Sequence, residues 1–277
     1  MPGGAGVKLR KNETMAESTT ELAVREKVVV ITGAARGLGQ EFARSLAAAG
    51  AFVVAADIND CSATLDLIEA ENGKAIGVAL DVRSAQSASD MTNAATRAFG
   101  RVDALINNAG TIRRGTALEF SQKDWDDVLR INLSGPFFLS QALGRWWINC
   151  GGRSNAGNDD RLRIINIASM LSFQGGIKVI SYTAAKHGLA GITKALANEW
   201  AGERINVNAI APGYIATENT RPLREDPVRN KAILERIPQG GWGDPDDIAG
   251  PVMWLASRDA DYVNGAVINI DGGWLAR

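Results

Sequence analysis

The chain has 277 residues, of which 45% are hydrophobic and 22% are charged, an ordinary globular composition. Its formal net charge is −1, so charge gives no reason to expect a nucleic-acid partner or attachment to an anionic membrane. One histidine and two widely separated cysteines argue against a Ser-His-Asp hydrolase, a metal site and a disulfide framework.

The first 24 residues are polar, mix Glu with Lys and Arg, and lack the apolar segment of a signal peptide. No later run approaches the roughly 18–20 apolar residues that a membrane-spanning helix needs. We therefore predict a flexible tail over 1–24 and a cytoplasmic location, which the cysteine usage also favours. Residues 25–277 contain no linker and no internal repeat, so we expect one domain.

From residue 27 onward, short β-branched runs alternate with Ala-rich amphipathic stretches. The predicted strands cover 28–32, 52–57, 75–81, 104–107, 163–169, 205–211 and 267–271. The predicted helices cover 37–49, 60–71, 86–99, 122–148, 181–201 and 246–256. This alternation predicts an α/β fold: a single doubly wound Rossmann-type domain with about seven parallel strands and helices on both faces.

A glycine-rich stretch, TGAARGLG at 32–39, follows the first predicted strand and opens the first predicted helix. Its glycines, Gly33, Gly37 and Gly39, permit a tight turn and let a diphosphate approach the backbone. The helix start then offers unpaired N–H groups to that anion. We therefore predict a dinucleotide site here.

Two acids at predicted strand ends bear on which dinucleotide binds. Asp57 ends the second strand and can accept hydrogen bonds from the ribose hydroxyls of NAD. It would repel the 2′-phosphate of NADP, whereas Arg36 would attract it, so NAD is expected and NADP stays possible. Asp81 ends the third strand, before Val82, and either approaches the adenine or caps the next turn.

A Tyr and a Lys lie four residues apart in the predicted helix 181–201, so Tyr182 and Lys186 share one face. A Lys ammonium favours the phenolate, as does the positively charged nicotinamide ring of an oxidised cofactor, so we expect both to lower the Tyr182 pKa from about 10 toward the working pH. Tyr182 can then exchange a proton with an alcohol or ketone. Ser169 ends the fifth predicted strand, where its hydroxyl can hold the substrate oxygen.

These motifs occur together in one known family. TGAARGLG, NNAG at 107–110, Asn132, Ser169, YTAAK at 182–186 and PG at 212–213 stand in the order found in short-chain dehydrogenases/reductases, which the chain resembles from residue 27 to its end. The resemblance implies a nicotinamide cofactor and catalytic roles for Asn132, Ser169, Tyr182 and Lys186. The cofactor residues that it implies are Gly33, Arg36, Gly37, Leu38, Gly39, Asp57, Asp81, Val82, Asn108, Ala109, Gly110, Tyr182, Lys186, Pro212, Gly213, Ile215 and Thr217.

The resemblance also assigns finer roles. Asn132, in the long helix, corresponds to the family residue that holds a water chain behind the Lys. The backbone of Ile215 and the hydroxyl of Thr217 correspond to contacts with the nicotinamide carboxamide. Asn107 either borders the cofactor riboses or only stabilises the central strand.

The second half of the chain is most similar to one branch of the family. The stretches NIASMLSFQGG, RIPQGGWGDP and DYVNGAVINIDGGWLAR resemble 2-deoxy-D-gluconate 3-dehydrogenases and gluconate 5-dehydrogenases. The implied substrate is a hydroxy or keto sugar acid. The alternatives are an NADPH-dependent 3-oxoacyl carrier-protein reductase and, less favoured, a non-catalytic nucleotide-binding protein.

Arg113 and Arg114 follow NNAG directly and leave the carboxyl edge of the fourth predicted strand. A guanidinium matches a carboxylate with two hydrogen bonds, so we expect Arg114 to bind the substrate acid, the alternative being a solvated surface pair. The long segment 217–243 is expected to be a substrate lid, the alternative being a surface insertion.

Apolar residues on several faces of the helices 122–148 and 181–201 favour a homotetramer. The residues concerned are Phe137, Phe138, Trp146, Leu189 and Trp200. A lone domain would struggle to cover all of them, and tetramers are what the family resemblance implies.

Overall fold

Seven strands form one parallel sheet in the order β3-β2-β1-β4-β5-β6-β7. The computed structural model describes residues 24–150 and 160–277. The strands are β1 (Val28–Thr32), β2 (Phe52–Asp57), β3 (Lys74–Ala79), β4 (Ala104–Asn107), β5 (Leu162–Ile167), β6 (Ile205–Pro212) and β7 (Val267–Ile270). The direction of strand succession reverses between β1 and β4, which is the position where such sheets bind ligands. The doubly wound α/β fold predicted from the sequence is confirmed.

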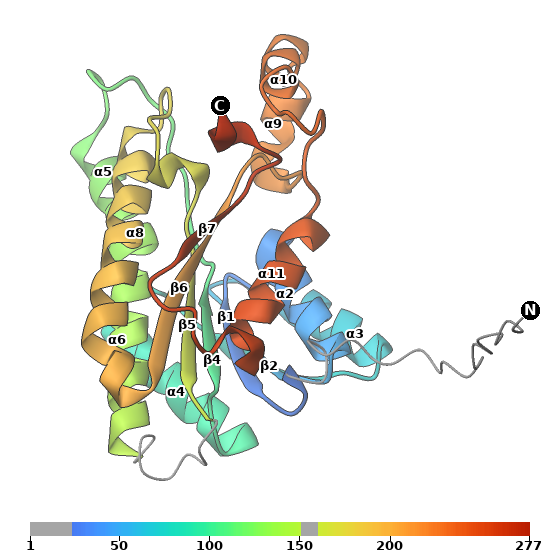
Figure 1. Cartoon of the computed structure of the whole chain (residues 1–277), viewed down its shortest axis with the longest axis vertical. Coiled ribbons are helices and arrows are strands. Elements are labelled where there is room, and N and C mark those ends of the chain that lie inside the picture. Colours follow the sequence, from blue (N-terminus) through green and yellow to red (C-terminus); the bar gives the residue numbers. More distant parts are fainter. Residues whose placement is uncertain (1–23, 151–159) are drawn as a thin grey trace, which may run out of the picture.

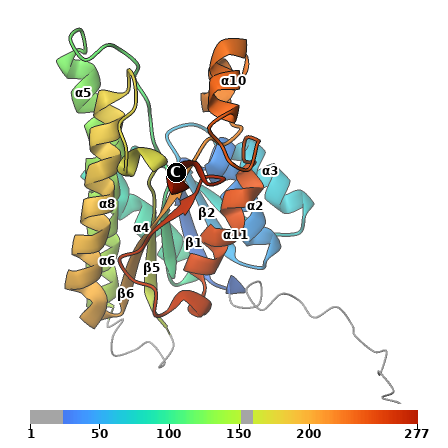
Figure 2. The same ribbon diagram turned by 45° about the horizontal axis from the view of Figure 1, so that its top comes forward.

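Helices cover both faces of the sheet, as Figures 1 and 2 show. One face carries α2 (Gly37–Ala48), α3 (Ser62–Ala70) and α11 (Pro245–Ala256). The other carries α4 (Ala85–Phe99), α6 (Gly135–Asn149) and α8 (Ile180–Trp200). The remaining helices are α5 (Gln122–Leu129), α9 (Arg221–Arg224) and α10 (Pro227–Leu234), with short turns η1 (Arg130–Ser134), η2 (Met170–Ser172), η3 (Ala201–Glu203), η4 (Glu218–Thr220), η5 (Arg258–Ala260) and η6 (Trp274–Ala276).

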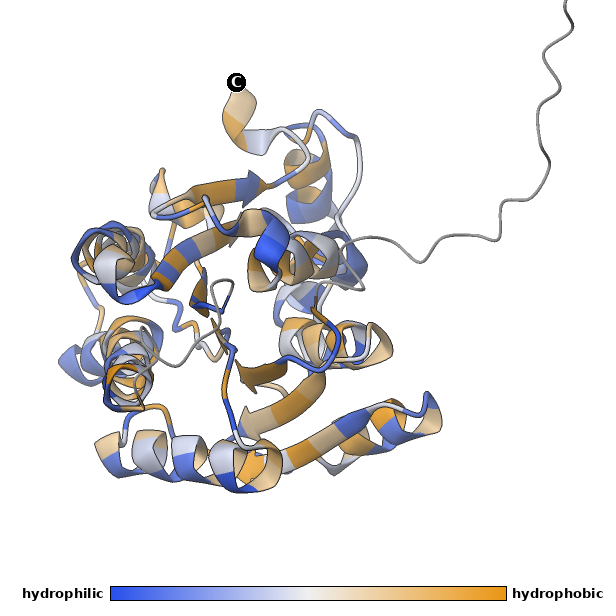
Figure 3. Ribbon diagram, turned by 60° about the horizontal axis from the view of Figure 1, so that its bottom comes forward, coloured by the Kyte–Doolittle hydropathy of each residue, from blue (hydrophilic) through white to orange (hydrophobic). Residues whose placement is uncertain are grey.

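Apolar residues gather on the strands and on the inner sides of the helices (Figure 3). Every residue of β1, β4, β5 and β6 is buried, as expected of parallel strands covered on both faces. One core cluster lies between the sheet and the first helix layer, around Phe42 and Val252. A second lies beneath the other layer, around Met91 and Leu143. The two cores fix the strand ends that carry the site.

Three predicted boundaries were wrong. The third and fifth strands end at Ala79 and Ile167, so Asp81 and Ser169 lie two residues beyond them. The chain turns away from the sheet at both places, and the Ser169 hydroxyl accepts the N–H of Leu171 in that turn. Val24 is completely buried, so the globular domain begins at least one residue earlier than expected. The rest of the predicted tail, 1–23, lies outside the described residues.

The predicted helix 122–148 is divided into α5, a π-helical turn and α6. Residue 136 is proline, which has no N–H to donate to the Asn132 carbonyl four residues earlier. The backbone widens instead, and the Gly135 N–H donates to the Arg130 carbonyl five residues back. Such π turns occur often at functional sites.

Segments that follow the carboxyl ends of the strands rise above one edge of the sheet (Figures 1 and 2). The loop after β4 and the start of α5 lie on one side of this edge, and α9 and α10 lie on the other. Within the two described ranges, no helix is both long and apolar enough to cross a membrane. The same residues contain no cluster of three or more His, Cys, Asp or Glu able to hold a metal ion.

Candidate active site

The glycine-rich turn after β1 has the geometry of a phosphate cradle. Gly33 and Gly37 have φ angles of +68° and +61°, in the region that favours glycine. A Cβ at Gly33 would lie 2.8 Å from the Ala109 Cα, and one at Gly39 would collide with the Gly33 carbonyl oxygen. A Cβ at Gly37 would meet nothing within 4 Å, so the backbone at the start of α2 is open to an incoming group. The turn therefore fits the diphosphate of a dinucleotide.

The loop after β4 is tied to this turn through Thr32 and Asn108. The Asn108 side chain donates to the carbonyl oxygens of Thr32 and Gly33 at 2.9 and 3.1 Å. The Thr32 hydroxyl accepts the N–H groups of Asn108 and Ala109, both at 3.0 Å. This role of Thr32 was not predicted from the sequence, because a threonine at the end of a buried strand indicates only a β-branched strand residue.

Asp57 lies beneath the glycine-rich turn. One carboxylate oxygen accepts the Ala35 N–H at 3.1 Å, and the other accepts the N–H and side-chain amide of Asn59 at 2.9 and 3.0 Å. Arg36 is exposed and makes no side-chain capping bond to α2, and Leu38 packs partly buried against the core. Asp57 and Arg36 therefore both belong to the region of the glycine-rich turn, and the preference for NAD over NADP stays a prediction.

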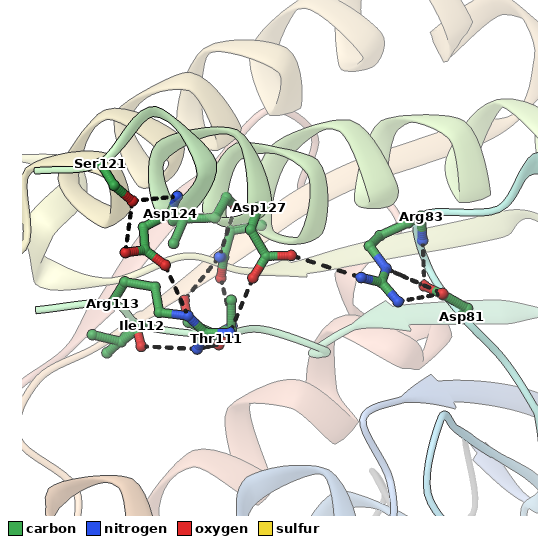
Figure 4. Close-up of polar contacts among 10 residues, drawn as sticks. Asp81, Arg83, Thr111, Ile112, Arg113, Ser121, Asp124 and Asp127 are labelled. Atoms are coloured by element: carbon green, nitrogen blue, oxygen red, sulfur yellow. Dashed lines mark hydrogen bonds and ion pairs between the residues drawn. The ribbon is translucent and has the colours of Figure 1, made fainter.

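Asp81 is held by Arg83 in the loop after β3 (Figure 4). Its carboxylate accepts the Arg83 N–H at 2.9 Å and two guanidinium nitrogens at 2.7–3.1 Å. These bonds lower the pKa of Asp81, against the effect of burial. Val82 packs partly buried against the second core cluster. Of the two expected roles of Asp81, the cap on the turn is observed, and contact with adenine stays a prediction.

Ser169, Tyr182 and Lys186 meet above the end of β5. The Lys186 Nζ donates to the Ile167 carbonyl at 2.6 Å and lies 5.4 Å from the centroid of the Tyr182 ring. The Ser169 side chain lies close enough to the Tyr182 hydroxyl to act on its pKa. The Ser172 hydroxyl donates to the Lys186 carbonyl at 2.8 Å and so ties this turn to α8.

Burial shifts the two titratable groups in opposite directions. It raises the pKa of Tyr182 to about 12, although the Ser169 hydrogen bond acts to lower it. It lowers the pKa of Lys186 to about 7. In the protein without cofactor, loss of hydration therefore outweighs the effect of the neighbouring side chains, and the expected lowering of the Tyr182 pKa with an oxidised cofactor bound stays a prediction.

Asn132 is completely buried inside the π turn. Its side-chain amide donates to the carbonyls of Thr111 and Val128, both at 2.9 Å, and its side-chain oxygen accepts the Thr111 N–H at 3.2 Å. A Cβ at Gly110 would lie 2.8 Å from that oxygen, so glycine allows the close approach. Asn132 thereby joins α5 to the loop that follows β4.

Asn107, the first residue of NNAG, belongs to the interior. Its side-chain amide donates to the Ser140 hydroxyl at 3.0 Å and to the Asn166 side-chain oxygen at 2.9 Å. Asn166 in turn donates to Thr193 at 2.9 Å. Of the two roles left open by the sequence, these contacts match stabilisation of the central strand.

The segment after β6 carries the last candidate cofactor residues. Pro212 ends the strand, and a Cβ on Gly213 would lie 2.7 Å from the Asp271 Cα. Ile215 is buried, and Thr217 caps the turn η4 with its N–H bonded to the Thr220 hydroxyl at 3.0 Å. The close packing on Asp271 is a sufficient reason for glycine at 213.

The two arginines after NNAG differ in their contacts. Arg113 donates to the Thr111 hydroxyl at 2.9 Å and to Asp127 at 3.0 Å, and it lies 3.6 Å from Asp124 (Figure 4). Asp127 also lies 3.7 Å from Arg83. Arg114 is exposed and has no hydrogen bond or ion pair within the described ranges. Of these two arginines, only Arg114 therefore has a guanidinium without a partner among the described residues.

Known proteins resemble this chain over nearly its whole length. The family model described as enoyl-(acyl carrier protein) reductase, a short-chain dehydrogenase/reductase model, matches residues 33–275. The 2-dehydro-3-deoxy-D-gluconate 5-dehydrogenase of Escherichia coli (strain K12) is 51% identical over 91% of this chain and 96% of its own length.

Solved structures resemble it as well. One from Agrobacterium tumefaciens, described as a 2-deoxy-D-gluconate 3-dehydrogenase with bound NADP, has a TM-score of 0.85 and 51% identity, covering 93% of this chain and 99% of that one. A gluconate 5-dehydrogenase from Burkholderia cenocepacia J2315, in complex with NADP and tartrate, has a TM-score of 0.86 and 33% identity, covering 94% and 100%.

Proposed function

Because this chain belongs to the short-chain dehydrogenase/reductase family and is an NAD(P)-dependent oxidoreductase, we propose that it interconverts a secondary alcohol and a ketone of a sugar acid. The proposed substrates are acids of the 2-dehydro-3-deoxy-D-gluconate, 2-deoxy-D-gluconate and gluconate type. The observation that carries this choice is the high identity to the E. coli enzyme over nearly the full length of both chains.

The open backbone at Gly37 and the start of α2 support the placement of the cofactor diphosphate. Asp57 would hold the adenosine ribose, and Lys186 the nicotinamide ribose. Asn108 to Gly110 and the segment from Pro212 to Thr217 would border the nicotinamide half. When bound, the cofactor supplies the acceptor or donor of the hydride.

Tyr182 is the proposed proton carrier, and Ser169 the proposed donor to the substrate oxygen. In ketone reduction, the Tyr182 hydroxyl gives its proton to the substrate oxygen, and in alcohol oxidation the phenolate takes it back. Ser169 lies close enough to the same hydroxyl to act on its pKa, so one substrate oxygen is proposed to contact both groups.

Lys186 is proposed to make the Tyr182 phenolate accessible. A protonated Lys186 lowers the pKa of the neighbouring Tyr182 phenol. Because burial favours the neutral amine of Lys186, this role requires that Lys186 keep its proton during the reaction. Asn132 is proposed to support this end of the site through its backbone carbonyl, whose usual helical donor is replaced by Pro136.

A spectrophotometric panel tests the proposal. The purified protein is assayed at 340 nm with NAD, NADP and their reduced forms against 2-dehydro-3-deoxy-D-gluconate, 2-deoxy-D-gluconate, D-gluconate and neutral polyols. We expect a sugar acid to give the highest kcat/KM. A neutral polyol that surpasses every acid would contradict the proposed substrate class.

The second candidate is a 3-oxoacyl carrier-protein reductase; the matching family model is described by a different reaction on carrier-protein substrates, the reduction of an enoyl group. That enzyme would reduce acetoacetyl-CoA with NADPH. The same panel therefore includes acetoacetyl-CoA, and turnover above that of the sugar acids would select this candidate. A chain that binds dinucleotides but turns over neither class would be the non-catalytic protein.

We propose that the protein is a cytoplasmic homotetramer. Phe138 and Ile148 are 48% and 46% exposed on α6. Ile148 lines a hollow together with Phe137, Leu196 and Trp200, whose rim also carries Arg145 and Glu199. These residues offer an apolar face to a second copy. Leu189 is completely buried in its own subunit, so its expected outward position was wrong. Light scattering at a monomer mass of 29.4 kDa would contradict the tetramer.

We also propose that segment 217–243 covers the substrate. It contains α9 and α10, and it packs with the C-terminal segment and Met170 in a separate cluster around Ile233 and Trp274. Since Met170 directly follows Ser169, this cluster joins the segment to the proposed catalytic turn.

A further inference from the structure

Segment 217–243 holds more positive charge than its own acids neutralise. Its acids are engaged in pairs of Glu218 and Glu225 with Arg221, of Glu235 with Lys231, and of Asp226 with the first N–H groups of α10. The other three cations, Arg224, Arg229 and Arg236, have no acidic partner among the described residues. Three guanidinium groups of the segment are therefore left without a carboxylate partner among the described residues.

Arg224 is the one of these that reaches the proposed site. Its Nη2 donates to the Thr217 carbonyl at 3.0 Å, at the base of the segment. Its Nε is buried and has no hydrogen-bond acceptor among the described residues. Buried polar groups in native proteins nearly always have a partner, and a buried cation needs one most.

Arg229 and Arg236 have other surroundings. The Arg236 guanidinium lies 3.9 Å from the centroid of the Trp274 ring, a cation–π contact. Burial raises the pKa of Tyr214, and the charges of Arg229 and Arg236 act to lower it, so both lie near its hydroxyl. Neither has a buried nitrogen without an acceptor.

We propose that Arg224 binds an anionic oxygen group in the active site and thereby helps to determine substrate specificity. Its Nη2 is fixed on Thr217, which orients the guanidinium, and no described carboxylate neutralises its charge. Its Nε has no acceptor and is covered by protein atoms, so the fork would have to turn for an anion to reach that nitrogen. Two sources share this chemistry: the carboxylate of the sugar acid and the diphosphate of the cofactor. The proposal rests on the proposed function only for the first source.

Arg114 and Arg224, the two arginines considered as partners of the substrate carboxylate, lie on opposite sides of the site. Arg114 lies in the loop after β4, on the side of α5, whereas Arg224 ends α9 on the other side of the carboxyl edge (Figure 1). An acid held from the α9 side would place its carboxylate next to Thr217.

Arg224→Gln and Arg224→Lys test the role of the fork, and Arg221→Gln is the matched control. Arg221 lies on the same short helix, is 57% exposed, and pairs with two acids, so its loss changes the net charge equally without touching Thr217. Circular dichroism and thermal melts show which variants fold, and Arg224→Lys carries the test if Arg224→Gln does not fold.

Calorimetry measures the binding of NADH and NADPH to each free variant. With saturating NADH, calorimetry then measures the binding of tartrate and of threitol. Both have a four-carbon chain, but tartrate carries two carboxylates and threitol carries none. These measurements need no turnover, so they remain informative if the enzyme does not act on sugar acids.

If Arg224 binds the carboxylate, Arg224→Gln weakens tartrate binding at least tenfold, while the affinities for threitol and NADH change less than threefold. If it binds the diphosphate, the Kd values for NADH and NADPH rise at least tenfold instead. Equal losses for tartrate, threitol and NADH, or losses no larger than those of Arg221→Gln, would overturn the proposal and leave Arg224 a support for the Thr217 loop. No tartrate binding to the wild-type complex, with NADH affinity unchanged in the variants, would overturn it as well.

Discussion

The ammonium nitrogen of Lys186 lies 5.4 Å from the centroid of the Tyr182 ring and 2.6 Å from the Ile167 carbonyl oxygen. This contact joins the first turns of α8 to the end of β5, because Lys186 reaches back across the turn that carries Ser169. The position of the amine is therefore fixed by the sheet, and the position of the phenol by the helix.

Replacing Tyr182 by Phe should remove the proton carrier and leave the ring in place. We expect kcat to fall by roughly 10²–10⁴-fold, the usual contribution of a positioned acid–base group. The Kd for NADH, measured by fluorescence, should change less than threefold. Turnover near the wild-type level would exclude Tyr182 as the proton carrier.

Lys186 should make folding stability depend on pH. Burial lowers its pKa to about 7, from the usual 10.5 of a lysine, so between these values the unfolded chain binds more protons than the folded one. Stability contributed by this group therefore rises with pH in that window, by at most about 1.4 kcal/mol per pH unit. Urea titrations of wild type and Lys186→Met at pH 7.5, 8.5 and 9.5 measure it.

We expect the difference in unfolding free energy between the two proteins to grow in favour of the wild type as the pH rises. Comparison with the variant cancels the other titrating groups. A difference that stays constant from pH 7.5 to 9.5 would mean that the folded protein keeps Lys186 fully protonated.

The cofactor preference should favour NAD over NADP. Asp57 lies beneath the glycine-rich turn, where its charge would repel a 2′-phosphate at close range, while Arg36 is exposed and acts in the opposite direction. The ratio of kcat/KM for the two cofactors measures the balance. Asp57→Asn should shift this ratio toward NADP, and Arg36→Ala should shift it toward NAD. A wild-type ratio that favours NADP would show that Arg36 dominates.

Asn132→Leu should cost both stability and activity. The substitution leaves the partly buried N–H and carbonyl of Thr111 without their partner, which costs up to about 1–3 kcal/mol per unsatisfied group. We expect a lower urea midpoint and at least a tenfold loss in kcat. Unchanged stability would contradict the bonds between Asn132 and the loop after β4.

Arg114→Ala should raise the KM for a sugar acid by roughly tenfold or more, the loss of a charged hydrogen bond of about 1.5–3 kcal/mol. Arg113→Ala is the matched control, because Arg113 is already paired with Asp127. Turnover of a neutral polyol should scarcely change. Equal losses on acids and polyols would assign Arg114 to the fold or to the cofactor.

The sequence predicted the parts of the molecule that depend on local spacing. Two features could be predicted because they depend only on residues close in the sequence. They are the shared helix face of Tyr182 and Lys186 and the turn formed by the glycines at 33, 37 and 39. The β-branched runs predicted all seven strands, and those of β1, β2 and β5 are nearly unbroken because a strand covered on both faces has few polar residues.

Features that arise from tertiary contacts escaped the sequence analysis. The apolar pattern continues through 122–148, so only the proline at 136 hinted at the π turn around Asn132. The bonds between Thr32 and Asn108 join residues 76 apart. The upward shift of the Tyr182 pKa depends on burial, and the pairing of Arg113 with Asp127 depends on where α5 packs.

The most direct test of the account is the steady-state oxidation of NADH at 340 nm by the wild-type protein. The assay compares 2-dehydro-3-deoxy-D-gluconate with acetoacetyl-CoA and with a neutral keto sugar, and Tyr182→Phe is the control. The account predicts the highest kcat/KM for the sugar acid and a loss of at least 10²-fold in the variant. A higher kcat/KM for acetoacetyl-CoA or for the neutral sugar would contradict it.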